Sequence, residues 1–108
     1  MSFSPPPADP VIGDAEFHEA WSAGDCVVVD VREAHEYDVG HIPGAVNQPL
    51  SAFDPADLPR GKPVVLVCQS GVRSLNALRR ALAEGAQDIR HYPGGTSGWR
   101  RLGGDIAL

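Results

Sequence analysis

The chain has 108 residues, of which 9 are Lys or Arg and 14 are Asp or Glu, so its net charge is -5. This length suits a single domain whose core needs no disulfides or metals. The acidic balance argues against nucleic acid or an anionic membrane surface as the main partner. The start of the chain has no export signal, and no apolar run approaches the ~20 residues of a membrane span. With only two cysteines, these features predict a cytoplasmic protein with reduced thiols.

The first ten residues differ in composition from the rest. Residues 1–10 hold four of the ten prolines and predict a flexible N-terminal arm, which leaves residues 11–108 as the folded domain. Val11 and Ile12 suggest a short edge strand. Asp14 is expected to cap the first helix.

Strands and helices are expected to alternate along the domain, because β-branched runs alternate with apolar residues spaced by three and four. The expected elements are a helix over 15–23, a buried strand over 26–31, a helical turn over 32–40, a turn into a short strand over 41–47, a turn over 51–53, a linker over 55–62, a buried strand over 63–68, a helix over 75–84, a strand over 89–92 and a helix over 96–102. This rhythm predicts an α/β fold with a mainly parallel sheet.

Cys68 is the most informative residue, because it ends a buried strand and opens a loop that leads into a helix. Helix N-termini and cationic neighbours lower the pKa of a cysteine from about 8.5 to about 3.5–7.5, which favours the thiolate. Gly71 permits the backbone angles that a ring of N–H groups requires. Arg73 offers a forked cation, and Ser74 is expected to cap the helix and direct its hydroxyl inward. The cluster favours a nucleophile over an inert core cysteine.

Other polar residues are weaker candidates. Cys26 is expected to pack in its strand, and a disulfide with Cys68 is disfavoured in a reducing compartment. Asp30, Arg32 and Glu36 gather where the first buried strand ends, and a salt-bridge network that supports the loop is favoured over plain surface solvation. The histidines have no metal-ligand spacing and are expected on the surface or in turns, so no metal or cofactor is predicted: they are His18, His35, His41 and His91.

Three segments resemble, in the same order, the motifs of rhodanese domains: residues 30–45, the loop 68–74 and residues 94–99. The resemblance implies a rhodanese-like α/β fold with a central, mainly parallel five-stranded sheet flanked by helices. It also implies a thiosulfate sulfurtransferase-like enzyme, in which Cys68 takes a sulfane sulfur from thiosulfate or a persulfide donor. Cys68 would hold the sulfur as a persulfide and pass it to a thiol or cyanide. The implied substrate-binding residues are Gln69, Ser70, Gly71, Val72, Arg73 and Ser74.

The loop leaves three functions open. Cys68 to Arg73 is six residues, the length that the resemblance associates with sulfur transfer, whereas related phosphatases and arsenate reductases have one residue more. Gln69 and Ser70 are neutral, so thiosulfate transfer could be slow and a protein persulfide could be the donor. A persulfide carrier or interaction module without turnover is the other alternative. Arg73 could bind the donor or pair with Glu36, and both roles remain open.

Overall fold

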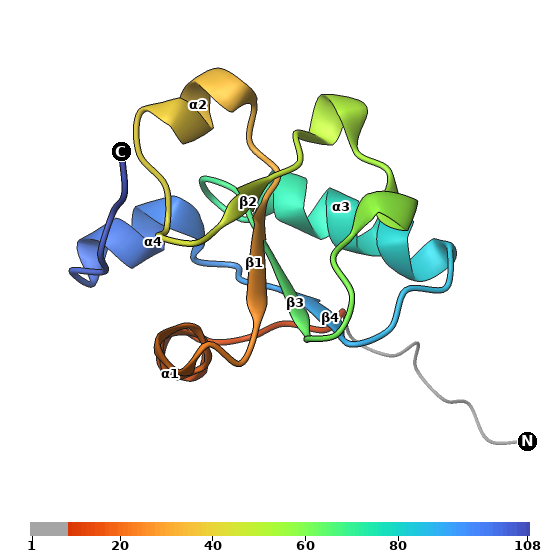
Figure 1. The fold of residues 1–108 in the computed structure, drawn as a ribbon, viewed down its shortest axis with the longest axis horizontal. Helices are drawn as coiled ribbons and strands as arrows, with labels where there is room; N and C mark the ends of the chain where they lie inside the picture. The colour runs from red at the N-terminus through yellow and green to blue at the C-terminus, as the bar shows by residue number, and fades with distance from the viewer. Residues whose placement is uncertain (1–8) are drawn as a thin grey trace, which may run out of the picture.

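The computed structural model describes residues 9–108, so most of the predicted arm, residues 1–8, lies outside the described part of the chain. Four parallel strands form one sheet, and Figure 1 shows their order, β2-β1-β3-β4. The strands are β1 (Val27–Asp30), β2 (Val46–Asn47), β3 (Val64–Val67) and β4 (Ile89–His91). The α/β class and the parallel sheet are therefore confirmed. The expected count of five strands is wrong for the described residues, because Val11 makes only an isolated bridge to His91.

Helices cover both faces of the sheet (Figure 1). The helices are α1 (Asp14–Ala23), α2 (Ala34–Asp38), α3 (Val72–Ala83) and α4 (Gly95–Arg101), with short 3-10 turns at Leu50–Ala52 and Pro55–Asp57. Side chains of α1 and α4 pack on one face, and side chains of α3 and the 3-10 turns pack on the other. This layering leaves the strand ends free to carry functional loops.

The two cores follow from the alternation of side chains along each strand. Val28 joins Phe17 and Trp99 in the core under α1 and α4. Its neighbour Val29 faces the opposite way and joins Leu78 of α3. All five side chains are at most 3% exposed. Each such burial stabilises the fold by about 1.5–3 kcal/mol, so the sheet is held from both sides.

Two helix starts differ from the sequence-based prediction. The helix after the Cys68 loop begins at Val72 rather than at residue 75, and its N-cap is Gly71, with φ 95°. Ser74 therefore lies within the first turn of α3 and does not cap it. The N-cap of α1 is Gly13, because the carboxylate of Asp14 accepts a hydrogen bond from the Tyr92 hydroxyl at 2.5 Å instead.

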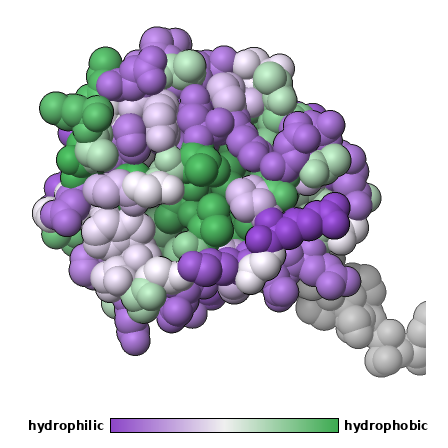
Figure 2. All heavy atoms as spheres, viewed as in Figure 1, coloured by the Kyte–Doolittle hydropathy of each residue, from purple (hydrophilic) through white to green (hydrophobic). Residues whose placement is uncertain are grey.

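The surface is mixed in character. Figure 2 shows hydrophobic residues near the centre of one face, over the strands, with hydrophilic residues around them. Val46, on the edge strand β2, is 41% exposed. No helix among residues 9–108 has the length and apolar character needed to cross a membrane. Cys26 is half-buried and, like Cys68, is a free thiol.

A buried ion pair stabilises the carboxyl end of β1. The guanidinium of Arg32 donates to both carboxylate oxygens of Asp30, at 2.7–3.0 Å, and Nη2 also donates to the carbonyl of Gly40 at 2.8 Å. The side-chain amide of Asn47 donates to the carbonyls of Asp30 and Arg32. These bonds join the end of β1 to the segment leading into β2.

We predict that Arg32→Met lowers the free energy of unfolding by about 3–5 kcal/mol, because it leaves the fully buried Asp30 carboxylate without its counter-charge. Urea denaturation would measure the loss. The matched control is Arg101→Met, which removes an exposed arginine and should change stability by about 0.5 kcal/mol or less. Equal losses in the two variants would contradict the structural role of the buried pair.

Candidate active site

Cys68 lies directly after β3, where the chain turns into α3. Its side chain is 1% exposed. The sulfur accepts hydrogen bonds from the backbone N–H groups of Gly71 at 3.1 Å and Ser74 at 3.3 Å. The hydroxyl of Ser74 is 3.5 Å from the sulfur. Two backbone donors thus converge on the Cys68 sulfur at the N-terminal end of a 12-residue helix, where the helix dipole also favours negative charge, and the thiol itself donates to the Ser74 oxygen.

The remaining residues of the predicted loop surround this sulfur without sharing one role. Gln69, Ser70 and Val72 are exposed and form the outer rim, with Val72 67% exposed. In the structure, the N–H groups that donate to the sulfur come from Gly71 and Ser74.

Arg73 forms a bidentate ion pair with Glu36 of α2, with N–O distances of 2.7 and 2.9 Å. This pairing lowers the pKa of the Glu36 carboxyl to about 2, chiefly through the hydrogen bonds from Arg73. Glu36 also accepts a hydrogen bond from the N–H of Glu33 in a capping box. The structure thus shows two separate pairs, Asp30 with Arg32 and Glu36 with Arg73, where the sequence suggested one network.

The start of α4 holds the backbone of the loop. The N–H of Thr96 donates to the carbonyl of Cys68 at 2.8 Å, and the N–H of Ser97 donates to the carbonyl of Gln69 at 3.1 Å. Gly95 has φ 63°, and a Cβ atom there would lie 2.3 Å from the Gln69 carbonyl oxygen. Sequence reasoning noticed this glycine-rich segment only as part of a family resemblance and missed its contact with the loop.

His91 is a second residue that the sequence missed. Its Nδ1 atom is 3.0 Å from the Ser74 hydroxyl, and the residue is 5% exposed. Burial lowers the pKa of the His91 imidazole. The expectation of a surface or turn position is therefore wrong for this histidine. A signal was available, because β4 follows the Cys68 helix and would pair in parallel with β3, as the Leu66–His91 register shows.

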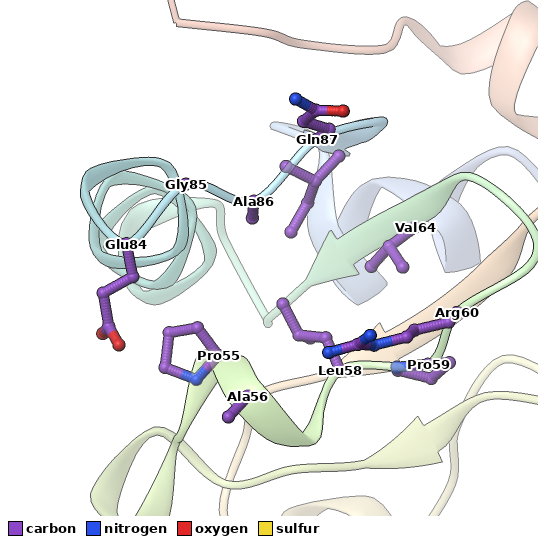
Figure 3. A pocket seen from close by; sticks show the side chains of 11 residues that line it. Pro55, Ala56, Leu58, Pro59, Arg60, Val64, Glu84, Gly85, Ala86 and Gln87 are labelled. Carbon is purple, nitrogen blue, oxygen red and sulfur yellow. The ribbon is translucent and has the colours of Figure 1, made fainter.

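A separate hollow lies away from Cys68. A cavity of about 540 Å³ is lined by residues of the Pro55–Asp57 turn, the end of α3 and the amino ends of β3 and β4. Figure 3 shows Pro55, Leu58 and Val64 around it, with Arg60 and Glu84 nearby. Cys68 follows the carboxyl end of β3, so the thiol and this cavity lie at opposite ends of the strand.

The site described above is centred on the Cys68 thiol. Across residues 9–108, no set of three His, Cys, Asp or Glu side chains is placed to hold a metal ion. A parallel α/β sheet with a buried cysteine at a strand end, under the N-terminus of the next helix, defines a cysteine-centred domain suited to bind a sulfur anion or a small oxyanion.

The sequence model of the rhodanese-like domain family matches residues 14–102, and the chain belongs to this family. It is 43% identical over 79 residues to the uncharacterized protein slr1261 of Synechocystis sp.. The match covers 71% of this chain and 44% of that protein. The chain spans less than a third of several longer enzymes that it also matches. The match confirms the predicted family without transferring the activity of any longer protein.

Solved structures of similar size share the fold. A rhodanese-related protein from Thermoplasma volcanium is 29% identical with a TM-score of 0.81, and the match covers 92% of this chain and 98% of that one. The human single-domain sulfurtransferase TSTD1 is 28% identical with a TM-score of 0.74, covering 87% and 97% of the two chains. The fold and its link to a sulfur-transfer family are thus established.

We predict that Glu36→Gln lowers the free energy of unfolding by about 1 kcal/mol near neutral pH, a modest loss because both partners of the pair are partly exposed. The pKa of Glu36 is lower in the folded protein than in the unfolded chain. Its contribution is therefore complete above about pH 5 and disappears as the pH falls toward about 2. Urea titrations across this range should show the two proteins converging in acid. A pH-independent difference would contradict this account of the ion pair.

We predict that Gly95→Ala both destabilises the fold and displaces the loop. The new methyl group would overlap the Gln69 carbonyl, adding about 1–3 kcal/mol to the cost of a left-handed backbone. Gly85→Ala is the control, because Gly85 has φ 90° and a methyl group there would meet no atom within 4 Å, so it should cost only about 1–2 kcal/mol. Denaturation would measure stability, and iodoacetamide labelling would report access to Cys68. Identical results for the two variants would exclude the proposed overlap.

Proposed function

We propose that this domain is a sulfurtransferase that moves a sulfane sulfur through a persulfide on Cys68. The observation that carries the proposal is the convergence of two backbone N–H groups on the Cys68 sulfur, with the Ser74 hydroxyl 3.5 Å away. Such donors stabilise a thiolate before the reaction and an anionic persulfide after it. The similarity to the human single-domain sulfurtransferase supports the same assignment.

The reaction has two balanced halves. The Cys68 thiolate attacks the outer sulfur of a donor, a new S–S bond forms, and the old bond breaks with its electron pair leaving on the donor remnant, which is sulfite when thiosulfate reacts. An acceptor thiolate or cyanide then attacks the terminal sulfur of the persulfide. The S–S bond to Cys68 breaks and the thiolate returns. Gly71 and Ser74 would hold the anion through both halves.

The rim of the loop favours a persulfide donor over thiosulfate. Gln69 and Ser70 are exposed and neutral, and both terminal nitrogens of Arg73 are hydrogen-bonded to Glu36. A doubly negative donor would therefore meet little uncompensated positive charge at the rim. A thiol persulfide, either a small molecule or one carried by a protein, would need less positive charge at the rim. We propose a cytoplasmic setting, where the free thiols of Cys26 and Cys68 would stay reduced.

Intact mass spectrometry after incubation with thiosulfate or a glutathione persulfide tests the proposal. One sulfur should add to the wild type and to Cys26→Ser, disappear on treatment with cyanide or a thiol, and be absent from Cys68→Ser. The persulfide donor should load the protein faster than thiosulfate. Cys26→Ser is the matched control, because Cys26 is a free but only half-buried thiol away from the loop. A folded wild type that gains no sulfur from either donor would refute sulfur transfer.

The same preparation separates the alternatives. A persulfide that forms but reaches neither cyanide nor a thiol would identify a carrier without turnover. Release of phosphate from an aryl phosphate, dependent on Cys68, would identify an oxyanion enzyme. The compact loop disfavours that outcome, because the two N–H groups lie within 3.3 Å of the sulfur and leave little room for a tetrahedral oxyanion between them.

A further inference from the structure

The Ser74 hydroxyl has more possible partners than it has protons. Its oxygen is 3.0 Å from His91 Nδ1, 3.2 Å from the Gly71 carbonyl oxygen and 3.5 Å from the Cys68 sulfur. A hydroxyl has one proton to donate and two lone pairs that accept. Whether Ser74 donates to the sulfur therefore depends on what its other neighbours do. Ser74 is fully buried, so bulk water does not compete for these positions.

Apart from the Cys68 sulfur itself, His91 is the only one of these neighbours that can change its hydrogen-bonding role. The Gly71 carbonyl always accepts, whereas Nδ1 of a neutral imidazole either donates or accepts, depending on the tautomer. Burial lowers the pKa of His91 and favours the neutral ring. Charged groups that act on the ring are Asp9 and Arg79, and these two pair with each other, so their opposite effects on the ring partly cancel.

The position of His91 is well fixed. Its N–H donates to the carbonyl of Pro10, and its own carbonyl accepts from the N–H of Ile12, both at 3.1 Å. His91 lies on β4, which pairs with β3, and its side chain faces Ser74. These backbone bonds keep β4 in place, with Nδ1 of the His91 ring 3.0 Å from the Ser74 hydroxyl oxygen.

Two arrangements follow. When Cys68 is a thiol, S–H donates to the Ser74 oxygen and the hydroxyl can donate to unprotonated Nδ1. When the sulfur is anionic, Nδ1–H donates to the Ser74 oxygen and the hydroxyl proton is free to turn to the sulfur. The hydroxyl proton then has two possible acceptors, the Gly71 carbonyl and the anionic sulfur. The sulfur is favoured, because hydrogen bonds to ionised groups are roughly twice as strong as neutral ones.

We propose that His91 is a positioning residue for Cys68, which acts through Ser74 to direct a hydroxyl hydrogen bond onto the sulfur whenever the sulfur is a thiolate or a persulfide. This inference rests on the proposed function, because it assumes that the anionic sulfur is the working state. It assigns a role to a residue that lies outside the Cys68 loop and on a separate strand.

The test measures the rate at which iodoacetamide alkylates Cys68 in the Cys26→Ser background, from acidic to alkaline pH. His91→Leu should slow alkylation about tenfold at neutral pH, since the thiolate loses one directed hydrogen bond. The rates should converge above about pH 9.5, where even an unassisted thiol is ionised. His91→Asn, whose side chain can place a donor near the Nδ1 position, should recover to within about threefold of the parent.

A double-variant cycle shows whether His91 acts through Ser74. Ser74→Ala alone should slow alkylation at neutral pH, and adding His91→Leu should cause no further change, because the intermediary is gone. An additive loss, an unchanged pH profile in His91→Leu, or an Asn variant as slow as the Leu variant would overturn the proposal. Circular dichroism and thermal melting check that each variant is folded. If His91→Leu does not fold, His91→Val replaces it, because valine suits a strand.

Parallel loading with glutathione persulfide keeps the two proposals separate. A parent protein that is alkylated but never gains sulfur would refute the proposed function, while the alkylation profiles would still decide the role of His91. A parent that gains sulfur with no dependence on His91 in either assay would refute the positioning role alone.

Discussion

The Cys68 loop keeps its shape because another element holds its backbone from behind. The N–H groups of Thr96 and Ser97 bind the carbonyls of Cys68 and Gln69, and this contact is possible only while residue 95 has no side chain. With those two carbonyls bonded to α4, the loop is held in the shape in which the N–H groups of Gly71 and Ser74 reach the sulfur. The proposed anion site therefore depends on two helices acting together, α3 in front of the sulfur and α4 behind the loop.

The positive charge that Arg73 places near the sulfur is balanced by the negative charge of Glu36. Arg73 brings a cation into the first turn of α3, but its guanidinium is neutralised by Glu36. The anion must then depend mainly on backbone dipoles and the Ser74 hydroxyl, which are oriented by the fold rather than by mobile side chains. Such fixed dipoles need little rearrangement when a thiolate becomes a persulfide, because both species carry one negative charge.

The sequence identifies the parts of the molecule that depend on local chemistry. The valine run before Cys68 predicts β3, and the residues of its loop predict a nucleophile, because each signal lies within one continuous segment. The predicted start of α3 is three residues late, since Gly71 reads as a loop residue until its left-handed backbone is known to precede a helix. The role of Thr96 could not be assigned, because it depends on which strand and helix ends meet in space, and His91 could be placed only through the expected pairing of β4 with β3. The prediction of a fifth strand is wrong for a related reason, because Val11 forms only a single bridge to His91, which is too little pairing for a ladder.

The pairing of Pro10 and Ile12 with His91 has a consequence for the outer side of the sheet. β4 is the last strand of its sheet, and an uncovered last strand presents unpaired N–H and carbonyl groups that other chains can use for strand addition. Both backbone groups of His91 are already occupied by the segment just before α1. This short segment blocks that end of β4 and so protects the domain from edge-to-edge aggregation, a task unrelated to sulfur chemistry but performed at the backbone of the same residue.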